Sequence, residues 1–203
     1  MSVGDQTQYD ASANASLKES KELPYSVLMS VYAKESPEYL VEALHSMLAQ
    51  TVPPEQIVLV EDGPLTHELD NAINVFHEQH AGLLDLVVLP KNEGLGSALA
   101  HGVPECRNEI IARMDSDDYS FSTRMEKELA VMSDNLDMVG SQIVEFIKDP
   151  YHPVAESDLP IDQQSIVSYS KKRNPFRHPS MVFRKSRVLE AGNYSADYLY
   201  FED

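Results

Sequence analysis

Three aspartates close together, Asp115, Asp117 and Asp118, are the residues of this sequence whose types and spacing most clearly indicate chemistry. Alternate residues of an extended segment project to the same side, so Asp115 and Asp117 could present oxygen atoms to one ion. Carboxylate oxygens are the ligands that Mg²⁺ and Mn²⁺ prefer. Two carboxylates about 4 Å apart repel each other by roughly 4 kcal/mol at an effective dielectric constant near 20. The cluster therefore needs a cation, a raised pKa or full exposure to water, and we expect a cation.

The acidic cluster directly follows the apolar run 110–114, which opens on two isoleucines and contains one charged residue, Arg113. A short apolar run that begins with β-branched residues predicts a buried strand. In open α/β sheets, ligands bind at the carboxyl ends of the strands. The alternative reading is a solvated strand end, in which Asp118 only caps the helix that follows.

The elements that would position this cluster follow one another in a regular alternation. Strands are predicted at 25–32, 56–60, 86–89, 110–114, 138–146 and 180–183, and helices at 37–48, 66–76, 94–100, from 122 or 123 onward, at 162–169 and at 185–191. Strands that alternate with amphipathic helices predict an α/β fold with a mostly parallel sheet covered on both faces. The second strand also ends on acids. Taken alone, Asp62 before Gly63 is more typical of a turn former than of a ligand-binding residue.

Composition limits the class of protein. The chain has 203 residues, 42% of them apolar, which suits one domain. Its formal charge of −17 argues against nucleic acid or an anionic membrane as the main partner of the whole surface. The single Cys106 excludes an intrachain disulfide, and no stretch has the pattern of a secretion signal or a transmembrane segment. We therefore expect a cytoplasmic protein, with residues 1–22 as a flexible extension.

One stretch reverses the overall charge. Residues 171–187 contain seven Lys and Arg and no acid. Prolines stiffen this stretch and Phe176 anchors it, so its cations would be held in place. A held cluster suits phosphate or pyrophosphate, which makes Lys172, Arg173 and Arg177 candidate phosphate- or acceptor-binding residues. The alternative is a solvated surface, and for His178 both readings stay open.

Several segments match a known family in their order and spacing. They are 26–32, 39–44, 50–51, 58–63, 92–96, 114–118 and the closing 202–203. Together they resemble the family 2 glycosyltransferases, whose nucleotide-sugar-binding fold is called GT-A, and the resemblance covers a domain at 23–203. Within that family, the segment 172–176 followed by His178 is most similar to bacterial enzymes of the amylovoran and O-antigen type, which extend lipid-pyrophosphate-linked sugars.

The resemblance implies a donor site built around the ends of the first two strands. Val31 and Tyr32 would line the pocket for the nucleotide base, and Glu35 would lie nearby. Asp62 would accept a hydrogen bond from the base, typically uracil. Ser30 and Ala33 depart from the common family pattern, which has Pro and Asn at these positions.

The resemblance also implies roles for the acidic cluster and for the end of the chain. Asp115 and Ser116 would lie near the ribose and diphosphate, and Asp117, with Asp115, would hold the Mn²⁺ or Mg²⁺ that bridges the diphosphate. Asp203 matches the general base of inverting members. Related chains continue past this Glu-Asp pair, so we expect the domain to be truncated here.

The activity implied is inverting transfer of a sugar from a nucleotide sugar, a UDP-sugar, to a saccharide or lipid-pyrophosphate-linked acceptor in surface polysaccharide biosynthesis. Such an enzyme would work in the cytoplasm, at the inner face of the membrane. Two alternatives remain open. A sugar nucleotidyltransferase would need a Gly-rich basic loop after the first strand, where this sequence has 32–36, Tyr-Ala-Lys-Glu-Ser. A non-catalytic fragment would bind nucleotide sugar or metal without turnover.

Overall fold

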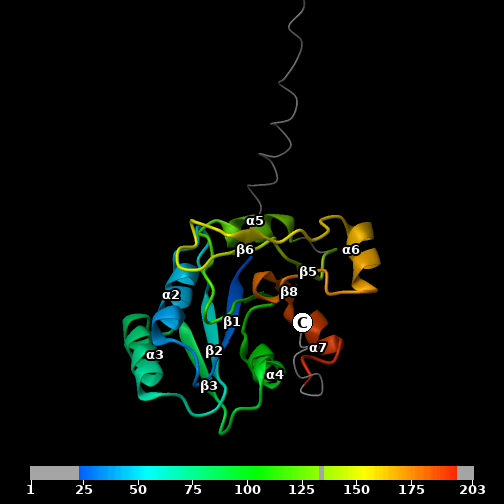
Figure 1. Ribbon diagram of the computed structural model, residues 1–203. Helices are drawn as coiled ribbons and strands as arrows, with labels where there is room; N and C mark the ends of the chain where they lie inside the picture. Colours follow the sequence, from blue (N-terminus) through cyan, green and yellow to red (C-terminus); the bar gives the residue numbers. More distant parts are fainter. Residues whose placement is uncertain (1–22, 133–134, 196–203) are drawn as a thin grey trace, which may run out of the picture.

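The computed structural model describes residues 23–132 and 135–195 of the chain (Figure 1). The predicted extension 1–22 and the predicted base Asp203 lie outside this part. A six-stranded sheet with the order β3-β2-β1-β4-β8-β5 forms the centre. Its strands are β1 (Tyr25–Val31), β2 (Gln56–Glu61), β3 (Leu84–Val88), β4 (Ile110–Arg113), β5 (Met138–Val139) and β8 (Val182–Arg184).

The sheet is mostly parallel, which confirms the predicted fold class. β3, β2, β1 and β4 run in the same direction, whereas β8 is antiparallel to both of its neighbours, β4 and β5. Val31 lies opposite Glu61, and Leu28 lies opposite Arg113. The carboxyl ends of β1, β2 and β4 therefore meet at one edge of the sheet, as the sequence predicts for the candidate site.

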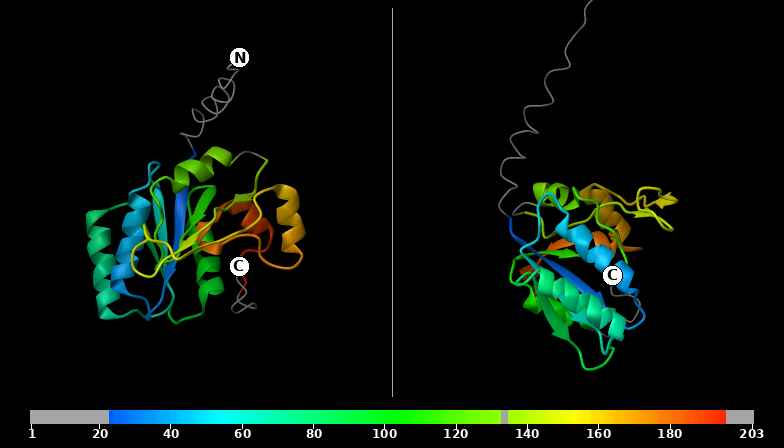
Figure 2. Two further views of the ribbon diagram at one scale, coloured as in Figure 1. Left: turned by 45° about the horizontal axis from the view of Figure 1, so that its top comes forward. Right: turned by 90° about the vertical axis from the view of Figure 1, so that its left-hand side faces the viewer.

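Helices cover both faces of the sheet. On one face, α2 (Pro37–Leu48), α3 (His67–Gln79) and α5 (Arg124–Val131) pack on Val27, Met29 and other alternate strand residues. On the other face, α4 (Leu95–Glu105) and α7 (Lys185–Glu190) pack with Leu28 and its neighbours. The right-hand view of Figure 2 places α2 and α3 in front of the strands. Within the described chain, no helix has both the length and the apolar content to cross a bilayer.

The predicted fifth strand at 138–146 is wrong, because two short strands in different sheets replace it. β5 pairs with β8, whereas β6 (Val144–Glu145) pairs with β7 (Ala155–Glu156) in a separate two-stranded sheet. Between them, the Ser180 side chain hydrogen-bonds the backbone of Ser141 at 2.9 and 3.2 Å. A Cβ atom on Gly140 would lie 2.9 Å from the Phe176 ring. After Val139 the chain leaves the central sheet, and the contacts with Ser180 and Phe176 hold it in this path.

Several predicted boundaries also move. The last strand begins at Val182 instead of residue 180, because His178–Ser180 forms a 3₁₀ turn. The third strand begins at Leu84 instead of residue 86. The helix α6 (Gln163–Ser170) is close to its prediction and has no buried residue. Ser36 and Thr66 cap α2 and α3 through their side chains, as their types predict.

Candidate functional site

The three aspartates after β4 relieve their mutual repulsion in three different ways. An oxygen of Asp115 lies 2.5 Å from Nη1 of Arg113, so this carboxylate has a cation within the protein. Asp117 is exposed to water. Asp118 is half-buried, and burial, followed by the charges of Asp115 and Asp117, raises the pKa of its carboxyl to about 6. Asp118 is not a helix cap, because α5 begins only at Arg124, with Thr123 at the N-cap.

Arg113 pairs with the acidic cluster, a role that its sequence pattern did not predict. Its side chain is fully buried, and none of its three guanidinium nitrogens makes a hydrogen bond in the part of the chain that the structure describes. The contact with Asp115 is a charge pair without hydrogen-bond alignment. Buried charges in proteins are normally paired. An arginine inside an apolar strand was the signal that could have identified this pair.

The loop after β1 joins the acidic cluster through Glu35. The Ser116 hydroxyl donates a hydrogen bond to Glu35 Oε2 at 3.2 Å, and Glu35 Oε1 accepts the backbone N–H of Ser36 at 2.8 Å. Tyr32 is 43% exposed in the same loop, whereas the Val31 side chain is buried in the core. A ligand in this loop would therefore contact Tyr32 and only the backbone of Val31.

Asp62, which follows β2, binds the loop that precedes α4. Its two carboxylate oxygens accept the backbone N–H groups of Glu93 at 2.7 Å and Gly94 at 3.0 Å. The Asn92 side chain donates to the Asp62 carbonyl at 3.2 Å. The carboxylate thus lies at the N-terminus of α4, where the helix dipole favours an anion. Each oxygen retains a second lone pair, so the predicted contact with a base stays a prediction.

Replacement of Gly63 by alanine should destabilise the protein by about 2–3 kcal/mol. Gly63 has φ +86°, and an added Cβ would lie 2.4 Å from the backbone nitrogen of Asn92. Gly82 is a matched control, because it has φ +84° and nothing within 4 Å of the added atom. Gly82→Ala should cost only about 1 kcal/mol. Urea unfolding measures both variants, and equal losses would contradict the close contact between the two loops.

Asp118→Asn should stabilise the metal-free protein at neutral pH. The folded pKa of about 6 lies above the ordinary value of 3.8, so the folded state binds the proton more tightly. The stability that this proton contributes is present below pH 4 and is lost as the pH rises to about 6. We expect a gain of about 2 kcal/mol at pH 7.5 and none at pH 3.5. Thermal unfolding in chelator tests this, and a gain that is independent of pH would refute it.

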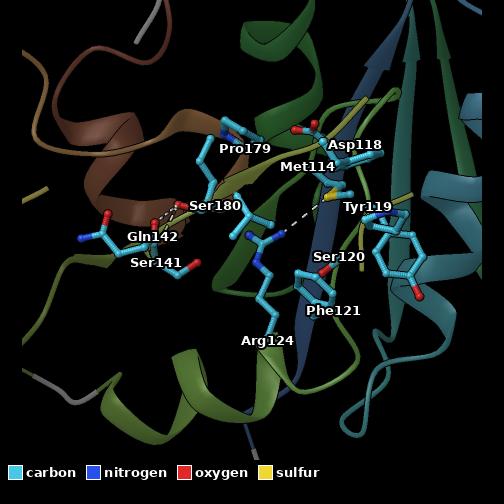
Figure 3. Close-up of a pocket in the computed structure, with 14 residues that line it drawn as sticks. Met114, Asp118, Tyr119, Ser120, Phe121, Arg124, Ser141, Gln142, Pro179 and Ser180 are labelled. Carbon is cyan, nitrogen blue, oxygen red and sulfur yellow. Dashed lines mark hydrogen bonds between the residues drawn. The ribbon is translucent and has the colours of Figure 1, made fainter. Parts of the chain in front are cut away.

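Two cavities adjoin the acidic cluster and share Asp118 and Tyr119 in their walls. The first, of about 230 Å³, extends from Arg124 to Ser141 and Ser180 (Figure 3). Arg124 lies within 3.5 Å of the Met114 sulfur there. The second is an open groove of about 540 Å³ that also includes Asp117. The exposed member of the acidic cluster therefore faces the groove.

Pro179 and Ser180 of the basic stretch line the first cavity together with Asp118, but no Lys or Arg of this stretch, which the structure describes throughout, lines either cavity. Lys172 lines a separate cavity on α6, and Arg173 and Arg177 are exposed. His178 is buried, with its Nε2 atom 2.9 Å from the Tyr194 hydroxyl. A role of these four residues in binding phosphate or acceptor stays a prediction.

The carboxylates suit a divalent cation that brings other ligands with it. In the described segments, no three His, Cys, Asp or Glu side chains gather closely enough to hold a metal alone. Mg²⁺ and similar ions are commonly bound by one or two carboxylates plus water and substrate phosphates. Asp117 is accessible for this purpose, whereas Asp115 has one oxygen committed to Arg113.

Proteins with similar sequences are glycosyltransferases. The amylovoran biosynthesis glycosyltransferase AmsE of Erwinia amylovora is 39% identical over 183 residues, which are 88% of this chain and 66% of that protein. An Escherichia coli UDP-Gal:alpha-D-GlcNAc-diphosphoundecaprenol beta-1,3-galactosyltransferase is 37% identical over 87% of this chain and 64% of its own length. The chain thus spans just under two thirds of these relatives.

Solved structures support the fold. The mannosyltransferase PcManGT of Pyrobaculum calidifontis, in complex with GDP-Man and Mn²⁺, superposes with a TM-score of 0.64 at 17% identity, over 92% of this chain and 54% of that one. S. aureus TarS 1-349 in complex with UDP gives 0.63 at 18% identity, over 88% of this chain and 52% of that one. Both likenesses support the predicted GT-A fold. The sequence profile described as "Glycosyl transferase family 2" matches residues 26–192, and the chain belongs to this family.

Proposed function

We propose that this chain forms the donor-binding part of a metal-dependent, inverting glycosyltransferase that uses a UDP-sugar. The main support for the proposal is that the aspartates of the acidic cluster have different environments. Arg113 neutralises Asp115, and Asp117 is left exposed next to Ser116, whose hydroxyl hydrogen-bonds Glu35 in the loop after β1. Family membership supports a transferase.

The residues divide the binding of the donor among them. Tyr32 would contact the base, Asp62 would accept a hydrogen bond from it, and Ser116 would lie near the ribose. Asp117 would hold the Mn²⁺ or Mg²⁺, with Asp115 beside it. When bound, the ion stabilises negative charge on the departing diphosphate as a Lewis acid.

The reaction is a direct displacement at the anomeric carbon. The acceptor hydroxyl oxygen forms a bond to this carbon while the bond to the diphosphate oxygen breaks, and UDP leaves with the electron pair. The hydroxyl proton passes to a carboxylate, for which we propose Asp203. General-base catalysis of this kind contributes roughly 10²- to 10⁴-fold in rate.

The name of one relative supports a proposal for the acceptor. The E. coli relative is named for a diphosphoundecaprenol-linked sugar, and the basic residues Lys172, Arg173 and Arg177 suit a pyrophosphate group. We therefore propose a lipid-pyrophosphate-linked saccharide as acceptor, in polysaccharide biosynthesis at the cytoplasmic face of the membrane.

A panel of nucleotides tests the donor class. Thermal shift with UDP, GDP and ADP, each with Mn²⁺ or with chelator, should give the largest stabilisation with UDP and Mn²⁺. Assays of UDP-sugar hydrolysis and of transfer to a glycoside then measure turnover. Stabilisation by ADP or GDP alone would contradict the UDP assignment.

Binding of nucleotide sugar and metal without turnover is the second candidate, because the acidic cluster and the loops of Glu35 and Asp62 could serve donor binding alone. It predicts stabilisation by UDP and Mn²⁺ without hydrolysis or transfer. A nucleotidyltransferase would instead release pyrophosphate from UTP and a sugar phosphate, and this product is measured in the same panel.

A further inference from the structure

The open groove beside Asp117 has a composition that differs from that of a phosphate site. Its lining comes from three segments: Tyr39 and Glu42 in the first half of α2, residues 143–148, and Asp117, Asp118 and Tyr119. The groove therefore opens directly from the candidate metal ligand and is distinct from the loops of Tyr32 and Asp62.

Aromatic side chains give the groove a rigid apolar surface. Tyr119 meets Phe121 and Tyr151 edge to face, with ring centroids 5.8 and 6.0 Å apart, and its hydroxyl lies 3.1 Å from that of Tyr151. Figure 3 shows the Tyr119 ring beside Asp118, directed away from the side of the cavity where Ser141 lies. Tyr39, which also lines the groove, is 55% exposed. Ring surface is thus available to a ligand without rearrangement of the core.

The charge of the groove selects among ligands. Its lining includes four acids and one base, namely Glu42, Asp117, Asp118, Glu145 and Lys148. With Asp117 assigned to the metal ion, three acids still face one base. This excess of acids repels free phosphate and an anionic lipid surface. Ionised carboxylates only accept hydrogen bonds, so they favour a neutral ligand that is rich in hydroxyl donors. Aromatic faces beside such acceptors suit the apolar C–H face of a sugar ring.

We propose that this groove binds a neutral pyranose ring of the acceptor saccharide, packed on Tyr39 and Tyr119 with Glu42 accepting hydroxyl hydrogen bonds. The inference rests on the proposed function and deepens it, because it names the chemistry of the acceptor sugar. The sugar and the charged part of the acceptor would then bind at different places. The acidic groove would bind the neutral sugar, and a charged acceptor group such as a pyrophosphate would bind elsewhere.

The test is saturation-transfer NMR of methyl glycosides with the full chain, UDP and Mg²⁺, which unlike Mn²⁺ is diamagnetic and does not broaden the ligand signals. The probes are methyl glucoside, galactoside, N-acetylglucosaminide and, as an anionic match, methyl glucuronide. A neutral glycoside should bind, and Tyr39→Ala and Tyr119→Leu should each weaken it about 3- to 10-fold. Glucuronide should bind less well than glucoside, and Glu42→Gln should narrow this difference. Val75→Ala, an exposed apolar change on α3, is the control.

The outcomes separate this inference from the proposed function. Affinity for UDP, measured by calorimetry on the same samples, should stay within twofold in both tyrosine variants. If UDP binds but the neutral glycosides do not, or if they bind equally to wild type and variants, the groove assignment is overturned and the donor site stands. Binding to phosphatidylglycerol vesicles that Tyr39→Ala abolishes would also overturn it. If UDP itself does not bind, the proposed function fails.

Discussion

Asp115→Ala should lower the free energy of unfolding by about 3–5 kcal/mol. The loss comes from Arg113, which is fully buried and has Asp115 as its charge partner at 2.5 Å. No guanidinium nitrogen of Arg113 has a hydrogen bond to take over this role in the described residues. The variant therefore leaves a buried cation that has no ion-pair partner among the residues the structure describes. Urea unfolding of the metal-free protein measures the effect.

Two further variants separate the ion pair from the acidic cluster as a whole. Asp117→Ala removes an exposed carboxylate two residues away and should change stability by less than about 0.5 kcal/mol. The double variant Arg113→Met, Asp115→Ala removes both charges and should recover most of the loss, because apolar residues often replace buried ion pairs well. A single Asp115→Ala variant as stable as Asp117→Ala would refute the pairing.

Asp117→Ala should instead abolish most Mn²⁺ binding in the presence of UDP. Asp117 is exposed at the groove, so its carboxylate can meet the ion without breaking contacts within the fold. We expect the affinity for Mn²⁺ to fall at least 10- to 100-fold, since even residues that only orient metal ligands have effects of that size. Electron paramagnetic resonance of free Mn²⁺ during titration measures the loss.

Asp118→Asn is the matched control for this prediction, because it removes a neighbouring carboxylate that is half-buried. It should retain Mn²⁺ binding within a few fold. A larger loss in Asp118→Asn than in Asp117→Ala would reverse the assignment of the two residues.

The strands and helices of the first half of the chain, which carry the candidate donor site, could be predicted from local sequence patterns. Val27, Leu28 and Met29 belong to an apolar run that can only be buried, and they face both layers of the core. Ser36 and Thr66 cap helices through side-chain bonds that depend on neighbouring residues alone. Such features need no knowledge of distant contacts.

The second half of the chain was harder to predict, because its strands pair with segments that are distant in the sequence. β8 reaches the sheet between β4 and β5, and Val182 lies opposite both Ala112 and Val139. The apolar character of 138–146 is continuous in the sequence, but contacts of Ser141 with Ser180 end the strand at Val139. Only the tertiary structure contains this information.

The candidate site could likewise be predicted only in part. The positions of its acids follow from the ends of the predicted strands, whereas the partner and the exposure of each acid could not be predicted. Asp115 differs from Asp117 because of the buried Arg113, and Asp62 is held by two backbone N–H groups of a loop about 30 residues away. The sequence alone cannot distinguish these carboxylates, because their different environments arise from tertiary packing.

Calorimetric titration of UDP into the wild-type chain, with Mn²⁺ and then with chelator, tests whether Asp117 and a bound cation form a nucleotide site. We expect binding with Mn²⁺ to be at least tenfold tighter than in chelator, because Asp117 and the diphosphate would share the ion. Equal affinity in the two conditions, or no UDP binding with Mn²⁺ present, would contradict a metal-dependent nucleotide-sugar site at this edge of the sheet.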